Sequence, residues 1–333
     1  MRLSTLTRCV VVASVFGGFE TGAIAHDGFL YVNGTFTTIA VPSAWQTIPT
    51  RINNAGQIVG YTSLPCTAAS CAGIVGFLYS GGAYSAIEVP GRYYTFLSGI
   101  NDKGQIVGST DFGDGFLYSN GTFSPLKIPD AYATIPQGIN NAGQIVGTVY
   151  PPCTSMSVCP DPNASGFLYS GGTFSIIDAT TSRPLEAAPD TRLQTFATDI
   201  NDAGQIVGDI YGSTTGTHGF LYSGGTFSAI DVPGAQNTSV SDINNAGQIV
   251  GTFQDRTGNH GFLYSSGTFS SFDFPGFTDT TVQGMNDAGQ ITGGNYNTVP
   301  APEPGSLVLF SVGLSLLGLA WCSRRRTVTA RIE

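Results

Sequence analysis

One repeating unit dominates the sequence. The tetrapeptide Gly-Phe-Leu-Tyr occurs six times, and so does a second motif of the form Ile-Asn-x-x-Gly-Gln-Ile-Val-Gly, which drifts in its last copy. The tetrapeptides begin at Gly28, Gly76, Gly115, Gly166, Gly219 and Gly261, and the second motifs at Ile52, Ile100, Ile139, Ile200, Ile243 and Met285. The spacing of about 47 residues per copy is in the range of propeller blades.

Each copy divides into four strand candidates. The first leads into Ile-Asn, the second is Gln-Ile-Val-Gly, the third is the tetrapeptide, and the fourth is the Thr-Phe-Ser segment after it. Asn, Asp and Gly between these segments supply the positive φ angles of tight hairpins. Aromatic and β-branched residues stand at positions of both parities, so both faces of such a sheet need covering, as radial stacking of sheets provides.

The ends of the array complement each other. Residues 28–40 supply only third and fourth strands, whereas residues 280–295 supply only first and second strands. We therefore predict an all-β fold, a six-bladed β-propeller of four-stranded antiparallel blades closed by N- and C-terminal half repeats. A β-solenoid or a sandwich is the alternative.

The N-terminus has the order of a secretory signal. Arg2 and Arg8 precede an apolar run over residues 9–16, and Ala23-Ile24-Ala25 follows. The run is shorter than the roughly 20 residues that cross a bilayer. We predict a signal peptide over residues 1–25 and a propeller domain over 26–297.

The C-terminal segment, residues 298–333, combines Pro302-Glu303-Pro304, an apolar stretch from Leu307 to Trp321, and Arg324-Arg325-Arg326. This predicts a transmembrane segment at about 307–321 with its charges on the cytoplasmic side. With the triplet, the tail resembles the PEP-CTERM sorting signal of Gram-negative bacteria, although residues 327–333 extend beyond its usual end. The resemblance implies an exosortase as a partner in the inner membrane. It also implies membrane contact through the tail, release to the cell surface, and an association with exopolysaccharide.

The repeats themselves resemble the HAF-type extracellular repeat of bacteria over about residues 26–295. That resemblance implies a location outside the cell and no particular activity.

Charge and cysteines agree with export. Without the two predicted end segments, 7 of the 13 basic and 19 of the 22 acidic residues remain, a net charge of −12. Such a surface repels phosphate backbones, which argues against nucleic-acid binding. Four cysteines form two close pairs, Cys66 with Cys71 and Cys153 with Cys159, which predicts local disulfides. Zinc binding is the alternative.

Length variation points to one face. Only the connections between second and third strands vary freely, apart from one insertion around residues 180–194. In a meander these connections share an end with the blade-to-blade connections, and we expect any binding surface there. Acids recur twelve residues after the Gly of four tetrapeptides, at Glu88, Asp178, Asp231 and Asp273. This ring could hold Ca²⁺ or a cationic partner, and a solvated outer-strand position is the other reading.

Catalytic motifs are missing from the sequence. It holds no Gly-x-Ser-x-Gly elbow and no phosphate loop. His26, His218 and His260 each lie just before a tetrapeptide, which favours a packing role. We expect a non-enzymatic surface or matrix module without a resident cofactor. The alternative is a secreted polysaccharide hydrolase or lyase that uses loop acids such as Asp111 and Asp114.

Overall fold

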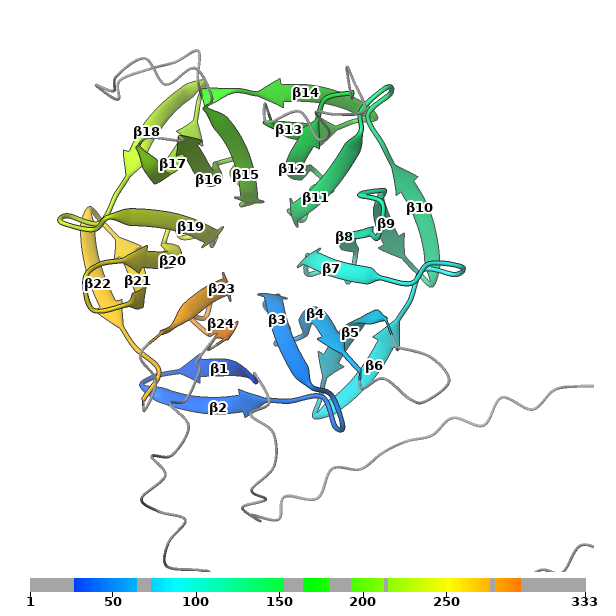
Figure 1. Ribbon diagram of the computed structural model, residues 1–333, viewed down its shortest axis with the longest axis horizontal. Helices are drawn as coiled ribbons and strands as arrows, with labels where there is room; N and C mark the ends of the chain where they lie inside the picture. Colours follow the sequence, from blue (N-terminus) through cyan, green and yellow to red (C-terminus); the bar gives the residue numbers. More distant parts are fainter. Residues whose placement is uncertain are drawn as a thin grey trace, which may run out of the picture. The chain divides into compact units, whose positions relative to one another are not determined.

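The computed structural model describes residues 27–64, 73–152, 164–179, 193–212, 215–275 and 279–294. The secondary-structure elements in these ranges are β-strands. They form six antiparallel sheets of four strands each around a common axis (Figure 1). The prediction of a six-bladed propeller is therefore confirmed. The predicted signal peptide, the four cysteines predicted to form disulfides and the C-terminal tail lie outside the described residues.

Each blade runs from an inner strand at the axis to an outer strand at the rim. The inner strands are β3 (Gln46–Ile52), β7 (Thr95–Ile100), β11 (Ala133–Ile139), β15 (Gln194–Ile200), β19 (Asn237–Ile243) and β23 (Thr281–Met285). The second strands are β4 (Ile58–Ser63), β8 (Ile106–Thr110), β12 (Ile145–Tyr150), β16 (Ile206–Gly212), β20 (Ile249–Gln254) and β24 (Ile291–Gly294). The third strands are β5 (Ile74–Ser80), β9 (Gly115–Ser119), β13 (Ser165–Ser170), β17 (Gly216–Ser223), β21 (Asn259–Ser265) and β1 (Gly28–Val32). The outer strands are β6 (Ala83–Ile87), β10 (Thr122–Leu126), β14 (Thr173–Ile177), β18 (Thr226–Ile230), β22 (Thr268–Phe272) and β2 (Thr35–Ile39).

The sixth blade is built from both ends of the array. Its strand order is β2-β1-β24-β23, and β1 pairs with β24 from Gly28 opposite Gly294 to Tyr31 opposite Ile291. The two half repeats therefore close the ring as predicted.

The hydrophobic core lies between neighbouring blades. In one of its six clusters, Val146 and Ile177 of one blade pack with Ala197, Ile206 and Phe220 of the next. The Phe of every tetrapeptide belongs to such a cluster and is at most 4% exposed. Each blade covers its neighbour, which explains why apolar residues occur at both parities.

The two sequence motifs are linked by packing. A Cβ atom at Gly251 would overlap the carbonyl oxygen of Ser239 and approach the ring of Phe262 to 2.8 Å. Gly60 has the same relation to Ile48 and Phe77. The last Gly of Ile-Val-Gly thus leaves the space into which the tetrapeptide Phe packs.

The propeller has two different ends. Hairpin turns between first and second strands and between third and fourth strands lie at one end, which we call the turn face; the former comprise residues 53–57, 101–105, 140–144, 201–205, 244–248 and 286–290. The second-to-third loops and the blade-to-blade connections lie at the other end, the loop face.

Candidate functional site

A β-bulge interrupts the inner strand of every blade. In β3 the register shifts between Pro49 and Arg51, and the other inner strands shift at the equivalent place. Bulges change the direction of backbone groups within a strand. The bulged residues are Thr50, Ser98, Gln137, Thr198, Ser241 and Gln283.

Arg51 occupies the axis at this level and is 8% exposed. Its guanidinium donates hydrogen bonds to the carbonyl oxygens of Thr198 and Ser241, each at 2.7 Å, and to those of Thr50 and Gln283. Strand β15, which carries Thr198, lies across the axis from β3 (Figure 1). One side chain thus joins four blades at the axis.

Two carboxylates flank this arginine. Arg51 Nε lies 3.8 Å from Asp199 Oδ1 and 3.6 Å from Asp242 Oδ2, and both acids are buried. Burial and the neighbouring charge of Asp199 raise the pKa of Asp242 well above its usual value, against the opposing effect of Arg51. Burial therefore favours the protonated form of Asp242.

The first Asn residues of the six turns between first and second strands together form a closed ring of hydrogen bonds. Its Nδ2 donates to the carbonyl oxygen of the same Asn in the next blade, at 3.0 to 3.5 Å, and the last of these bonds runs from Asn286 back to Asn53. Its Oδ1 accepts a backbone N–H within its own turn, such as that of Gln57. The six residues are Asn53, Asn101, Asn140, Asn201, Asn244 and Asn286, all buried.

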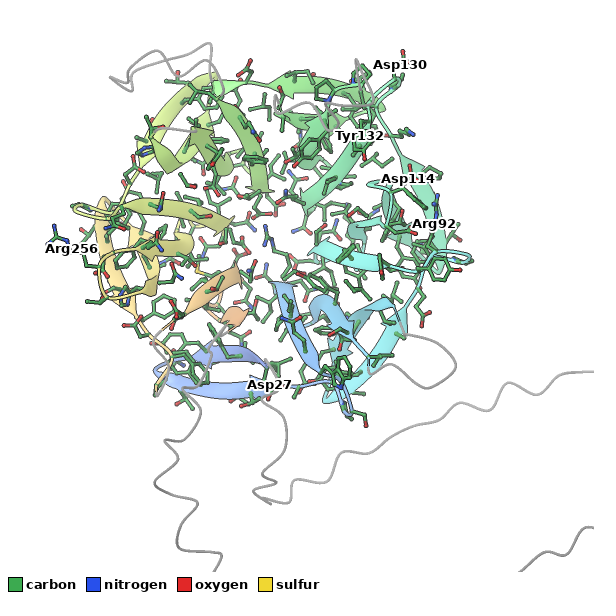
Figure 2. All side chains as sticks on the ribbon, in the orientation of Figure 1. Asp27, Arg92, Asp114, Asp130, Tyr132 and Arg256 are labelled. Atoms are coloured by element: carbon green, nitrogen blue, oxygen red, sulfur yellow. The ribbon has the colours of Figure 1, made fainter. Side chains whose placement is uncertain are left out.

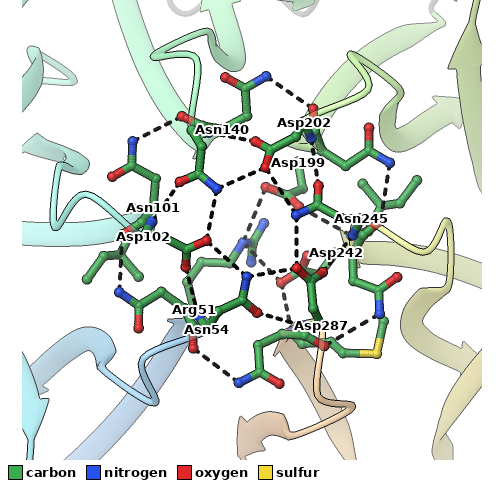
Figure 3. A pocket seen from close by; sticks show the side chains of 18 of the residues that line it. Arg51, Asn54, Asn101, Asp102, Asn140, Asp199, Asp202, Asp242, Asn245 and Asp287 are labelled. Carbon is green, nitrogen blue, oxygen red and sulfur yellow. Dashed lines mark hydrogen bonds and ion pairs between the residues drawn. The ribbon is translucent and has the colours of Figure 1, made fainter.

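The next turn residue alternates between Asn and Asp around the axis (Figure 3). Asn54, Asp102, Asn141, Asp202, Asn245 and Asp287 make this second ring. Each carboxylate accepts side-chain N–H groups from the Asn on either side, at 2.7 to 3.1 Å. Burial raises the pKa of Asp102, but hydrogen bonds from Asn141 and Asn54 outweigh it and lower that pKa overall.

This second ring locks the blades together at the turn face. The Asn-Asp-x-Gly segments are hairpin turns, as expected, yet their side chains also bond between blades. The sequence signal for this role is the strict alternation of Asn and Asp, which fits only an even number of blades.

Exposed aromatic side chains gather on the loop face. Trp45, Tyr93 and Tyr132 are 57%, 79% and 50% exposed and lie in the connections that lead into three consecutive blades. Phe112, which is 69% exposed, lies in the β8–β9 loop within this arc. We call these four residues the aromatic arc.

Charged groups accompany the arc. The guanidinium of Arg92 lies 5.5 Å from the centre of the Phe112 ring, and its Nη2 is 2.7 Å from Asp114 Oδ2. Arg92, Asp114 and Tyr132 lie in one sector of the ring (Figure 2). A polar cavity of about 360 Å³ also lies on the loop side of Arg51, lined by hydroxyl and amide side chains that include Ser239, Ser241 and Gln283.

The predicted acid ring lies at the rim. Glu88, Asp178, Asp231 and Asp273 each follow the outer strand of a different blade. Asp231 lies 3.3 Å from His218, and Asp273 lies 2.8 Å from His260, so two of these acids pair across strands with the histidines noted above. Lys127 and Asp114 are a cross-strand pair at the same position with the charges exchanged, at 3.7 Å. Cation binding by this ring stays a prediction.

Among the described residues, no group of three or more His, Cys, Asp or Glu side chains is arranged to hold a metal ion. The same part of the chain contains no helix with the length and apolar character of a membrane span.

Comparisons with known proteins identify the tail and the fold. Residues 300–326 match the PEP-CTERM protein-sorting motif, which indicates an exported protein that exosortase sorts to the cell envelope or surface. A comparison with curated proteins found no match.

Solved structures share the architecture. A protein assigned as TolB from Agrobacterium tumefaciens has a TM-score of 0.56 at 12% identity, over 84% of this chain and all of that one. The β-propeller domain of the Trilobed protease from Pyrococcus furiosus gives 0.44 at 13% identity, over 76% and 75%. AofleA from Arthrobotrys oligospora gives 0.45 at 11% identity, over 76% and 80%. At these identities the likeness shows the fold alone.

Proposed function

We propose that this chain is a non-enzymatic surface module that binds exopolysaccharide through its loop face, outside a Gram-negative cell. The observation that carries the proposal is the aromatic arc, which has three exposed rings on the connections into consecutive blades and a fourth on the β8–β9 loop. Aromatic rings stack on the apolar face of a sugar ring, and neighbouring polar groups fix its orientation. Large exposed apolar side chains gathered on one face are typical of interaction surfaces.

The rest of the propeller suits this role. The Asn and Asp rings hold the turn face rigid, so the arc sits on an ordered scaffold and binding orders few side chains. The sorting motif supplies the location, and the proposal includes anchoring of the chain in the membrane before the tail is processed. The likeness of the repeats to the HAF type fits the same extracellular setting.

Retention of the purified protein in gels that contain polysaccharide tests the proposal. The polymers are the exopolysaccharide of the exporting cells and a panel of other bacterial and plant polysaccharides. We expect retention of the wild type by at least one polymer, and loss of about tenfold in affinity in the triple variant Tyr93→Ala, Phe112→Ala, Tyr132→Ala, which corresponds to roughly 1.4 kcal/mol.

Ile176→Ala is the matched control, because Ile176 is 58% exposed but lies on the outer strand β14. Equal retention of the triple variant and the control would contradict binding by the loop face. New reducing ends released by the wild type would instead support the hydrolase alternative.

A further inference from the structure

The polar cavity on the loop side of Arg51 has the size of a small ligand site. Its volume of about 360 Å³ lies within the range of small-molecule sites, about 300 to 1,000 Å³. Most of its lining residues carry hydroxyl or amide side chains: Gln137, Thr198, Ser239, Ser241, Thr252, Asn259, Thr281 and Gln283. All of these residues are partly exposed, so a ligand can reach them. We call this space the axial cavity.

Two inner strands depart from the repeat at the axial cavity. Two residues before the bulge, β19 carries Ser239 and β23 carries Thr281, and both line the cavity. At the same position, strands β3, β7, β11 and β15 carry the large apolar residues Ile48, Phe96, Ile135 and Phe196. The two hydroxyl residues therefore leave space and polar groups where the other four inner strands place apolar bulk.

The second strands show the same departure. Tyr61 of β4 and Phe96 of β7 pack edge to face at the junction of their two blades, with ring centres 5.1 Å apart. The equivalent residues at the junction of the β19 and β23 blades are Thr252 and Thr281. Both of these threonines line the axial cavity. The cavity thus lies where two hydroxyl side chains replace a pair of aromatic rings.

Several polar groups in the lining can form further hydrogen bonds. In the described part of the chain, the side chains of Thr281 and Gln283 form no hydrogen bond. Thr252 Oγ1 accepts the Val282 N–H at 3.0 Å, so its own proton is free to donate. Ser241 Oγ donates to the Val282 carbonyl oxygen at 2.7 Å and can still accept. The lining therefore offers both donors and acceptors to a ligand.

The charges at the cavity disfavour an ionic ligand. No carboxylate occurs among the described residues that line it, so a cation meets no counter-charge. Arg51 also lines it, but its two Nη atoms already donate to four carbonyl oxygens, so an anion finds no free Nη donor. A ligand with several neighbouring uncharged hydroxyl groups suits this lining, because each hydroxyl both donates and accepts.

We infer that the axial cavity binds one uncharged sugar unit, held by the side chains of Ser239, Thr281 and Gln283. The inference rests on the proposed function for the source of the sugar, since we take the unit to belong to the polymer that the aromatic arc holds. It adds a second subsite on the loop face and a preference for neutral over acidic sugars.

Titration of the purified protein with monosaccharides, followed by protein NMR shifts, tests the inference. The probes are the methyl glycosides of glucose, galactose and mannose, with methyl glucuronide as the acidic counterpart. We expect saturable shifts around Thr281 and Gln283 for at least one neutral probe, with millimolar affinity, and at least tenfold weaker binding of the glucuronide.

Thr281→Phe closes the cavity with the residue that β7 and β15 carry at this position, and it should weaken the neutral probe at least tenfold. Thr226→Phe is the matched control, since Thr226 is the exposed first residue of the outer strand β18. It should bind the probe as the wild type does.

A second variant keeps the test valid if Thr281→Phe fails to fold. Gln283→Leu removes the side-chain amide but keeps the backbone carbonyl that accepts from Arg51, so we expect a folded protein. It should weaken the neutral probe severalfold. A melting temperature close to that of the wild type separates this loss of binding from a loss of structure.

Three results would overturn the inference: wild-type affinity in both Thr281→Phe and Gln283→Leu, equal binding of the glucuronide, or no saturable shift with any neutral probe at about 100-fold molar excess. The last result would mean that water alone fills the axial cavity. Polysaccharide retention that depends on the aromatic arc would still support the proposed function in each case.

Discussion

Arg51 is the side chain through which four inner strands meet, and the buried Asp242 beside it makes the stability of the fold depend on pH. The pKa of Asp242 is raised in the folded protein, so its stabilising effect is complete below about pH 4 and is lost as pH rises through the raised value. Burial raises the pKa of Asp209 to about 7, with the same sign, although Ser239 and Val240 donate hydrogen bonds that oppose the rise. At pH values between the unfolded and the folded pKa of these two acids, the folded state binds more protons than the unfolded state.

Asp242→Asn tests this assignment. We expect the free energy of unfolding of the wild type to fall between pH 4 and 7, with a slope of up to about 1.4 kcal/mol per pH unit for each retained proton. The variant should show a shallower slope, because Asn stays neutral while its Oδ1 accepts the Met285 N–H that Asp242 accepts now. Urea unfolding at several pH values measures this, and parallel wild-type and variant curves would refute the assignment.

Substitution of a buried Asn in the ring formed by the first Asn of each turn tests how much that ring stabilises the fold. Asn140 donates to Gln144 and to the Asn201 carbonyl, and it accepts two backbone N–H groups. Asn140→Ala leaves these buried partners unpaired, and we expect a loss of about 3 kcal/mol. The control Asn120→Gly, at an exposed turn, should change stability by less than about 1 kcal/mol. Similar values for the two variants in chemical unfolding would mean that the ring contributes little.

At the level of strands, the sequence was a good guide because every strand carries a repeated motif. Six copies of one pattern fix the strand limits, the turns and the closure by half repeats. The bulges at residues such as Thr50 and Thr198 were not predicted, since a single extra residue leaves no mark in the hydrophobic pattern. The Asn and Asp rings were not predicted either, because their bonds join residues 39 to 233 positions apart.

Gly251 tests the packing that links the two motifs. Gly251→Ala would place a methyl group against the Ser239 carbonyl and the Phe262 ring, and we expect destabilisation by about 3 kcal/mol or more. Gly121→Asn is a fair control, because Gly121 has a φ of 79° that Asn tolerates and has nothing within 4 Å of its Cβ position. We expect a melting temperature lowered by several degrees for Gly251→Ala alone. Equal melting temperatures would contradict the packing role.

On the scale of the whole molecule, the propeller separates stability from recognition. The turn face is closed by inter-blade hydrogen bonds and carries the constant motif. The loop face carries the aromatic arc and the hydroxyl-lined axial cavity. The sequence predicted which end would vary, because loop lengths differ only there. It did not predict the axial cavity, because Arg51, Ser241 and Gln283 come together only through the packing of three inner strands.

Hydroxyl-radical footprinting of the purified protein, with and without the retained polymer, tests whether the loop face holds the polysaccharide, because it reports on individual aromatic side chains. We predict severalfold slower oxidation of Trp45, Tyr93, Phe112 and Tyr132 when the polymer is bound, and unchanged oxidation of the exposed Ile176 on β14. Unprotected rings in the aromatic arc under conditions of full polymer binding would show that the polysaccharide binds elsewhere.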